Sequence, residues 1–173
     1  MVVAEAFIRT AMRSDLAAVK SLLAETWHAT YDSVIGAEKV DEVTSLWHSP
    51  EALESRLSAP NSEFLVADTG SGIAGMAFAS QNGREITLHQ LYVAPALQGE
   101  GVGTKLVGEL LTCFIGAETM RVEVASANAN ALAFYRACGF ASDGSDPVTE
   151  ETTGTDHVTL VLDIPEQHRW NAL

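Results

Sequence analysis

Apolar residues in the first third of the chain recur at helical spacing, and near residue 63 the pattern changes to one typical of strands. Five residues define the first helical face: Leu16, Val19, Leu22, Leu23 and Trp27. A strand at residues 6–12 precedes this helix, and Ser14 is its predicted N-cap. We expect a second helix near residues 38–47 and a short third helix over residues 50–57.

Apolar runs after residue 63 predict three strands. They cover residues 64–68, 73–80 and 85–93. A turn at residues 69–72 joins the first two, and the pair Asn82-Gly83, a strong hairpin signal, joins the second and third. The sequence therefore predicts a three-stranded antiparallel meander.

The last part of the chain alternates helices with strands. Seven apolar residues mark the predicted core face of the first helix there: Val102, Leu106, Val107, Leu110, Leu111, Phe114 and Ile115. A strand at residues 120–125, a helix carrying Tyr135 and two strands near residues 140–143 and 157–164 follow. This order predicts an α/β fold with a single mixed, mostly antiparallel central sheet flanked by helices, in one domain spanning residues 1–173.

The composition is that of a soluble globular protein, with 47% hydrophobic residues and a mean hydropathy of +0.10. No apolar run approaches the roughly 20 residues that cross a membrane, and the N-terminus lacks a basic leader with an apolar core. Cys113 and Cys138 lie in predicted helices without C-x-x-C spacing. We therefore expect a reduced, cytoplasmic protein that does not associate with membranes.

The chain is strongly acidic, with 23 Asp and Glu against 10 Lys and Arg and a formal charge of −13. This charge would repel a nucleic-acid backbone, so no nucleic-acid partner is expected. It would attract a cationic ligand, or it serves solubility alone. The five histidines lack the spacing of metal ligands, and no metal is expected.

A glycine-rich turn at residues 98–103 connects an apolar strand to an amphipathic helix. Its backbone N–H groups stand at a helix N-terminus, where they lack partners and favour a phosphate. The dinucleotide motif fails because Thr104 stands where glycine is needed, and the nucleotide P-loop fails because Leu106 replaces Ser or Thr. The loop instead reads Q-x-x-G-x-G. A glycine turn without a ligand remains the alternative at this point.

A second signature lies in residues 122–140. Asn128 precedes Tyr135 by seven residues, and Gly139-Phe140 follows at the end of the same predicted helix. The two signatures, in this order within one run of strands and helices, resemble the GNAT superfamily of CoA-dependent N-acetyltransferases. The resemblance covers nearly the whole chain and implies acetyl-CoA as the acetyl donor.

The resemblance implies direct attack of a neutral amine on the thioester, with main-chain amides holding the pyrophosphate. The implied cofactor-binding residues are Leu91, Tyr92, Val93, Gln98, Gly99, Glu100, Gly101, Val102, Gly103, Thr104, Asn128, Asn130, Tyr135 and Arg136. Asn128 would orient the cofactor or cap its helix. Arg136 would pair with the 3′-phosphate, or lie free in solvent.

Three residues are candidates for proton transfer. Tyr135 is the expected acid for the departing thiolate, because a phenol of pKa about 10 can pass a proton to that group. Some relatives carry a glutamate as base where this chain has Thr87. Glu85 and His89 share a strand face with Thr87, so His89 acting directly or Glu85 acting through water are the candidate bases. An inert, hydrogen-bonded His89 is the alternative.

The expected acceptor pocket combines aromatic residues after the first helix with an acidic loop. Trp27 and Tyr31 supply the aromatic side chains, and residues 142–156 hold acidic residues without a basic one. This favours a small cationic amine or polyamine, against the alternative of core aromatics beside a solvated loop. A non-catalytic acyl-CoA sensor and acetylation of a protein or peptide amine are the other functions considered.

The family resemblance also implies a homodimer. Trp170, in an otherwise polar tail, would dock on its own subunit, meet a partner or stay disordered.

Overall fold

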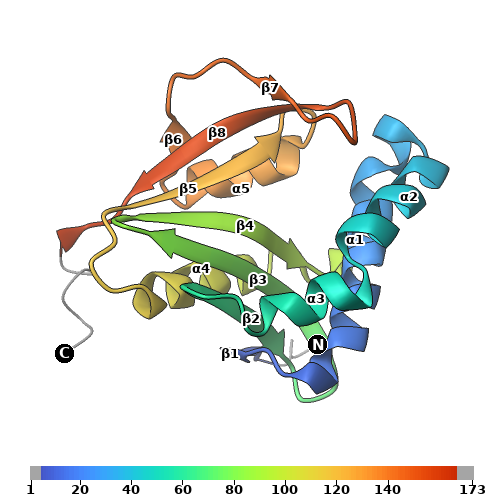
Figure 1. Ribbon diagram of the computed structural model, residues 1–173, viewed down its shortest axis with the longest axis horizontal. Helices are drawn as coiled ribbons and strands as arrows, with labels where there is room; N and C mark the ends of the chain where they lie inside the picture. The colour runs from blue at the N-terminus through green and yellow to red at the C-terminus, as the bar shows by residue number, and fades with distance from the viewer. Residues whose placement is uncertain (1–4, 167–173) are drawn as a thin grey trace.

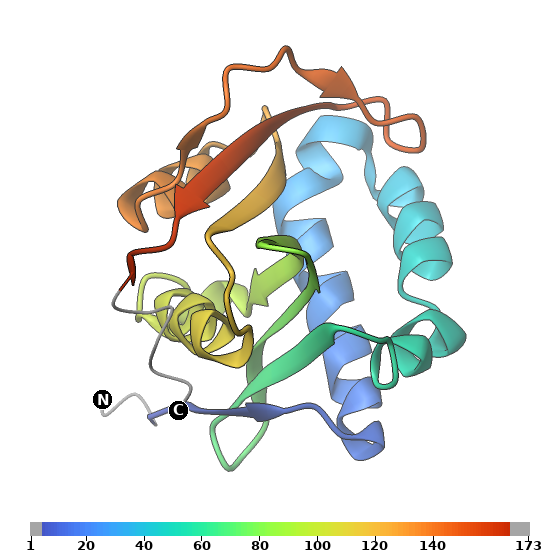
Figure 2. The ribbon, with the colours of Figure 1, turned by 60° about the vertical axis from the view of Figure 1, so that its left-hand side comes forward.

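The computed structural model describes residues 5–166, so the predictions about Trp170 fall outside the described residues. Its centre is an eight-stranded sheet, shown in Figures 1 and 2. The strands are β1 (Phe7–Thr10), β2 (Ser62–Asp68), β3 (Ile73–Asn82), β4 (Glu85–Val93), β5 (Thr119–Ala125), β6 (Ala141–Ser142), β7 (Val148–Thr149) and β8 (Asp156–Asp163).

The strand order is β1-β2-β3-β4-β5-β8-β6, with β7 paired to β8. Among the strands of residues 5–166, only β4 and β5 run parallel, and every other pair is antiparallel. The predicted mixed, mostly antiparallel sheet and the predicted meander of β2, β3 and β4 are therefore confirmed.

Helices cover both faces of the sheet. The helices are α1 (Leu16–Ile35), α2 (Ala37–Trp47), α3 (Pro50–Arg56), α4 (Val102–Cys113) and α5 (Ala129–Ala137). The helices α1 and α3 pack with Phe64, Val66 and Met76, which alternate along the strands with the residues that pack against α4 and α5. Two apolar layers thus enclose the sheet, because strand side chains point alternately to its two faces.

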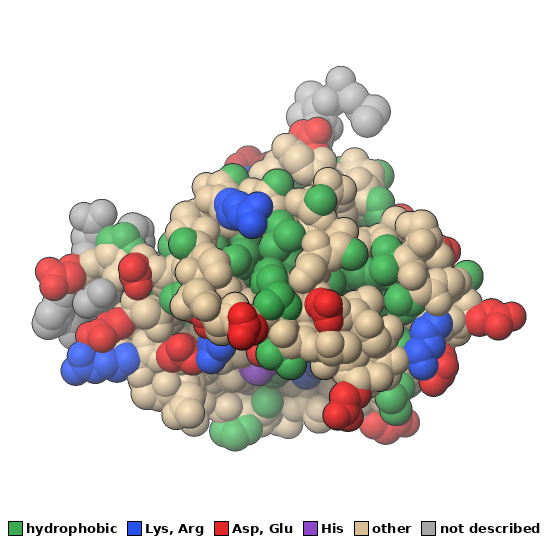
Figure 3. Space-filling view, turned by 90° about the horizontal axis from the view of Figure 1, so that it is seen from above, with side chains coloured by type: hydrophobic (Ala, Val, Ile, Leu, Met, Phe, Trp, Pro, Cys, Tyr) green, Lys and Arg blue, Asp and Glu red, His purple; other side chains and the backbone are tan. Residues whose placement is uncertain are grey.

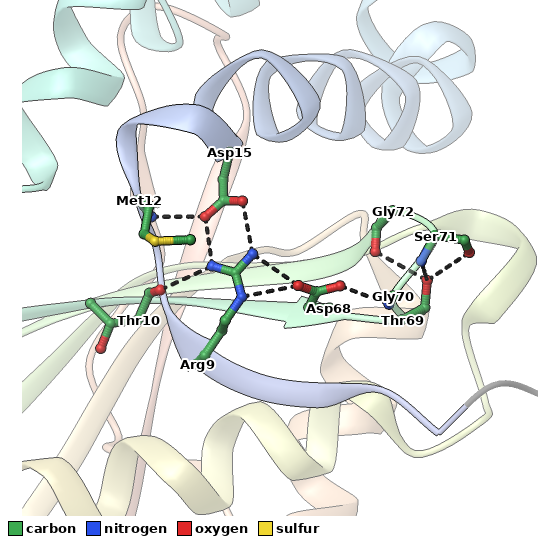
Figure 4. Close-up of polar contacts among 9 residues, drawn as sticks. All are labelled: Arg9, Thr10, Met12, Asp15, Asp68, Thr69, Gly70, Ser71 and Gly72. Atoms are coloured by element: carbon green, nitrogen blue, oxygen red, sulfur yellow. Dashed lines mark hydrogen bonds and ion pairs between the residues drawn. The ribbon is translucent and has the colours of Figure 1, made fainter.

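The start of α1 differs from the prediction. A short 3-10 turn (Arg13–Asp15) precedes it. Asp15, rather than the predicted Ser14, is the N-cap position of α1, and its side chain bonds to the backbone at the start of this turn. Figure 4 shows the Asp15 carboxylate accepting hydrogen bonds from Met12 N (2.8 Å) and from two nitrogens of Arg9 (2.7 and 2.9 Å). Arg9 also pairs with Asp68 on β2 (2.9 Å). This partly buried charged network ties β1 and β2 to the 3-10 turn before α1. Capping rules consider only residues close in sequence, so they do not predict it.

Two further differences concern helix ends. The helix α1 continues to Ile35 and stops at Gly36, whose φ of +86° favours glycine. Ile115, predicted on the core face, is 69% exposed because α4 ends at Cys113 and the chain turns away at Gly116. The other six residues of that predicted face are buried or pack against the core.

The surface carries acidic side chains on many sides. Figure 3 shows Asp and Glu scattered over one face among fewer Lys and Arg, without one dominant patch. None of the helices in residues 5–166 combines the length and the apolar character that crossing a membrane requires.

Candidate active site

The two parallel strands separate halfway along the sheet. Residues Glu85–Leu88 of β4 pair with Thr119–Val122 of β5, and beyond this point each strand pairs only with its outer neighbour. Figure 1 shows the two strands close together at one end and apart at the end next to α1 and α2. A cavity of about 540 Å³ lies at this opening. Residues of β4, β5, α1 and α5 all line it.

The opening leaves backbone groups of β4 without a strand partner. Hydrogen-bonded pairs alternate in an antiparallel ladder, and Ala94 N bonds to Ala74 O. Because successive N–H groups along a strand point in opposite directions, those of Val93 and Leu91 point away from β3 and into the opening. The carbonyl of Val93 points the same way and accepts from Gln98 Nε2 at 3.1 Å. The Gln98 side chain thus ties the glycine loop to the end of β4.

The loop before α4 presents free donors. Within the described residues, the backbone N–H groups of Gly99, Gly101, Val102 and Gly103 make no hydrogen bond. Gly99 and Gly101 have φ of +82° and +84°, a left-handed conformation that disfavours other residues. These N–H groups lie at the positive end of the α4 dipole, and the arrangement fits a diphosphate.

A second requirement for glycine comes from packing. A Cβ at Gly103 would lie 3.0 Å from two ring carbons of Phe134 on α5. Glycine at this position therefore allows α4 and α5 to approach closely beside the opening.

The residue Asn128 connects both sides of the opening. Its Oδ1 accepts from Ala131 N at 3.0 Å and caps α5, so the predicted capping role is observed. Its Nδ2 donates to Tyr31 Oη on α1 at 3.4 Å. Asn130 and Arg136 of the same segment are exposed, and Arg136 forms no ion pair with another described residue.

Tyr135 lines the cavity from α5 and is 6% exposed. Its ring packs edge-on against Phe134 and Phe140, with centroids 5.2 and 5.3 Å away. Burial raises the pKa of the Tyr135 phenol well above its usual range, because the phenolate would lose its hydration. The side chain is therefore a neutral hydroxyl at neutral pH, suited to donating a proton or hydrogen bond.

Aromatic rings form the wall on the α1 side. Trp27 lies 4.7 Å from Tyr31 and 5.6 Å from Trp47, measured between ring centroids. The two predicted acceptor-side residues, Trp27 and Tyr31, thus meet in the cavity with Trp47 and Tyr92. Burial raises the pKa of Tyr31 and of Tyr92, so both remain neutral.

A bulge in the β3–β4 pairing changes which residues of β4 face this wall. Gln90 pairs with Phe78 but Leu88 pairs with Ala79, so His89 is an extra residue. Before the bulge, Ile86 and Leu88 point to the α4 face. After it, Leu91 and Val93 do so. His89, Gln90 and Tyr92 therefore all line the same cavity, which strict alternation would not allow.

The two candidate bases occupy different places. His89 lines the cavity, its Nε2 lies 2.7 Å from Ser80 Oγ, and burial and the charge of Arg56 lower its pKa. Glu85 does not line the cavity. It lies about 20 Å along β4 from Leu91 and faces Arg121, with 3.7 Å between Glu85 Oε1 and Arg121 Nη1. Thr87 is absent from the cavity wall as well.

Several residues of the wall were not among the sequence candidates, and two of them, His48 and Arg56, bear on the electrostatics of the site. His48, between α2 and α3, is 2% exposed. Burial chiefly, with the nearby charge of Arg56, lowers its pKa to about 4. Its Nδ1 lies 3.4 Å from Gln90 Nε2, and its buried Nε2 has no partner within the described residues. The only sequence signal was its place before Ser49-Pro50, where Ser49 Oγ caps α3 by accepting from Ala52 N at 3.2 Å.

The second residue is Arg56, the last residue of α3. Its Nη2 donates to Trp47 O at 3.0 Å and its Cζ lies 5.8 Å from the centre of the Phe78 ring. Its Nη1 is buried and has no hydrogen-bond partner within the described residues. No periodicity or motif distinguishes this arginine in the sequence.

The acidic loop contributes less to the cavity than expected. Of its carboxylates only Glu150 lines the wall, and Glu150 Oε2 already accepts from Thr153 N and Oγ1 at 2.7 and 2.9 Å. Asp143 is engaged by Ser145, and Asp156 by Thr149. Across residues 5–166, His, Cys, Asp and Glu form no group of three that would hold a metal ion.

Comparison with known proteins places these features in a family context. Residues 31–162 match the family model described as an acetyltransferase (GNAT) domain. The N-alpha-acetyltransferase RimI of Mycobacterium tuberculosis is 34% identical over 118 residues, which are 66% of this chain and 74% of that protein. The thialysine N-epsilon-acetyltransferase of Bos taurus is 29% identical over 85 residues, 48% of this chain and 50% of its own length.

Solved structures share the architecture. The PaiA N-acetyltransferase of Thermoplasma acidophilum in complex with coenzyme A superposes with a TM-score of 0.81 at 21% identity, covering 92% of this chain and 99% of that one. The ribosomal-protein-S18-alanine N-acetyltransferase of Escherichia coli gives a TM-score of 0.68 at 20% identity, with 92% and 94% covered. At these identities the likeness concerns the fold.

Proposed function

Because the chain belongs to the GNAT superfamily of acetyl-CoA-dependent N-acetyltransferases, we propose that it acetylates the primary amine of a small molecule by direct transfer in a ternary complex. One observation carries the proposal. A continuous cavity is lined by Leu91 and Tyr135 on one side of the sheet opening and by Trp27 and His89 on the other. Two substrates would meet there, which suits direct transfer in a ternary complex.

The residues at the opening fit acetyl-CoA. The free N–H groups of Gly99, Gly101, Val102 and Gly103 would hold its pyrophosphate. Those of Leu91 and Val93 would face its acyl end. The other residues proposed to contact acetyl-CoA are Tyr92, Glu100, Thr104, Asn128 and Asn130. When bound, acetyl-CoA supplies the acetyl group as a thioester open to attack by an amine.

Arg136 is proposed to pair with the 3′-phosphate. It is exposed on the α5 surface and forms no ion pair with another described residue, so its charge is available. Glu100, the only charged side chain of the loop, cannot play this part.

Two side chains would handle the protons. Tyr135 keeps its proton at neutral pH and would deliver it to the sulfur of the leaving thiolate. His89 would take the proton of the incoming ammonium, because its lowered pKa keeps the ring neutral. His48 also lines the cavity, but its pKa of about 4 makes it a weak base. Glu85 lies too far along β4 for either task.

The experiment is thiol release from acetyl-CoA across a panel of primary amines: amino acids, polyamines, aminoglycosides and lysine or N-terminal peptides. We expect turnover with a small amine and a fall in kcat of about 10²–10⁴-fold in Tyr135→Phe, with CoA affinity retained. Phe134→Leu, which alters a neighbouring ring without a hydroxyl, is the matched control. CoA-dependent thermal stabilisation without turnover on any amine would contradict the proposal and favour an acyl-CoA sensor.

A second candidate function is acetylation of a protein or peptide α-amine. The observation that favours it is the 34% identity to the N-alpha-acetyltransferase RimI over 118 residues. Turnover restricted to N-terminal peptides in the same panel would select it over the small-molecule proposal.

A further inference from the structure

Arg56 is a partly buried charge in the cavity wall, and it pairs with no carboxylate among the described residues. Its Nη1 has no hydrogen-bond partner within the described residues, and its other contacts are the Trp47 carbonyl and the face of Phe78. Four other arginines pair with carboxylates: Arg9, Arg13, Arg84 and Arg121. In a chain with 23 acidic residues, the missing partner of Arg56 does not reflect a shortage of carboxylates.

Such an arrangement is costly unless a ligand completes it. A guanidinium does not lose its proton in proteins, so Arg56 stays positive in a partly desolvated site. Its charge acts on the cavity, since it lowers the pKa of both His48 and His89. The acidic residues of the wall do not neutralise it: Glu150 is held by Thr153, and Glu123 does not pair with Arg56.

We propose that the acetyl acceptor is a primary amine that also carries a carboxylate, and that Arg56 binds this carboxylate. The inference rests on the proposed function for the amine. A planar guanidinium matches a carboxylate, and Arg56 is one of the residues that line the cavity. A polyamine has no group for this site and would be repelled by it, which argues against the polyamine acceptor that the acidic loop suggested.

The dimensions of the sheet suit a small molecule. Arg56 lies over Phe78 on β3, and Phe78 pairs with Gln90 on β4. Strands are about 4.8 Å apart, so across the sheet the opening beyond β4 lies roughly 5–10 Å from the backbone of Phe78. An amine and a carboxylate separated by a few bonds would span this distance.

The test compares amines in matched pairs. Each pair is an amino acid and its carboxamide, from α-amino acids to β-alanine, 4-aminobutyrate and 6-aminohexanoate, with acetyl-CoA saturating. We expect kcat/KM for the preferred acid to exceed that for its amide by about tenfold to a hundredfold, the effect of a charge-assisted hydrogen bond. Polyamines and N-terminal peptides without a nearby carboxylate should be poor acceptors.

Variants of Arg56 separate recognition from structure. In Arg56→Gln we expect the acid-to-amide ratio of kcat/KM to fall towards one. The loss of the Arg56 charge also changes the pKa of His89, but this effect is common to acid and amide and cancels in the ratio. Arg56→Lys should keep part of the preference, since it keeps the charge. Arg84→Gln, a distant exposed arginine, is the control and should leave the ratio unchanged. An equal loss for acid and amide in Arg56→Gln would indicate a structural role and overturn the inference.

A binding measurement keeps the two proposals distinguishable. The N-acetylated product of each acid, and of its amide, is titrated into CoA-saturated protein, and thermal stabilisation is recorded. Turnover without preference for acids overturns the inference and leaves the proposed function standing. Arg56-dependent stabilisation by the acid products without any turnover leaves the inference standing and overturns the proposed function. Neither turnover nor stabilisation overturns both.

Discussion

Protonation of His48 should make the stability of this protein depend on pH in a predictable way. The ring is 2% exposed, and burial lowers its pKa to about 4 from an ordinary value near 6.5. Between these two values the unfolded chain binds a proton that the folded protein does not. The free energy of unfolding contributed by this residue is therefore complete above about pH 6.5 and falls as the pH falls towards 4.

The magnitude follows from the two pKa values. Going from pH 7.5 to pH 5.0, the unfolded state gains almost one full proton at this site and the folded state gains about a tenth of one. Linkage gives a loss of about 2 kcal/mol in the free energy of unfolding over this interval. A protein of this size is stable by only about 5–15 kcal/mol, so the effect is measurable.

The assay is urea unfolding of the parent and of His48→Gln at both pH values, followed by tryptophan fluorescence, to which the buried Trp27 contributes. Subtracting the two proteins removes all other titrating groups. We expect the parent to lose about 2 kcal/mol more than the variant between pH 7.5 and pH 5.0. The comparison uses the difference in slope, so it holds even if His48→Gln is less stable throughout.

A control of opposite sign is available at His28. Asp32 chiefly, with Asp41, raises the pKa of this exposed ring, so its contribution is present at low pH and is lost as the pH rises. His28→Gln should therefore cost more at pH 5.0 than at pH 7.5. Equal pH slopes for the parent and His48→Gln would refute the reasoning that burial holds this ring neutral.

Three further predictions concern the loop, the base and the charged network. Gly101→Ala forces a left-handed residue and should weaken CoA binding in calorimetric titration while costing about 1–2 kcal/mol of stability, whereas Gly108→Ala, in open space on α4, should leave CoA binding unchanged. His89→Gln should remove the acidic limb of the kcat/KM profile against pH, and an unchanged profile would dismiss His89 as base. Asp15→Asn should lower the urea-derived stability by about 1–3 kcal/mol, and a loss below 0.5 kcal/mol would contradict the proposed importance of its bonds to Arg9.

Local sequence patterns were sufficient for most of the fold. The strand period of β2, β3 and β4, the Asn82-Gly83 hairpin and the helical spacing in α4 each express a short-range rule, and the structure agrees with them. The errors fall where distant groups decide. Asp15 replaces Ser14 at the start of α1 because Arg9 and Asp68 lie beside it.

In the candidate site, too, some residues could be found from local spacing, and others only from the folded structure. Two parts of the site are each a continuous stretch of sequence: the loop of residues 98–103 and the segment from Asn128 to Tyr135. The spacing of their residues was therefore enough to indicate them. His48, Arg56 and Gln90 come from separate elements, and each is unremarkable in its own segment. They share a cavity because β4 and β5 separate and because the bulge at His89 shifts the facing of β4.

The sequence by itself thus determined the family and the sheet, and it is also the source of the proposed place of the cofactor, because these depend on periodicity and on a backbone conformation that glycine encodes locally. Only the tertiary structure decided the acceptor side. Which side chains are buried, and which are paired, depends on the folded protein. The acidic loop uses Glu150 to bind its own Thr153, and Arg56, the single arginine of the cavity wall among the described residues, is left without a carboxylate partner.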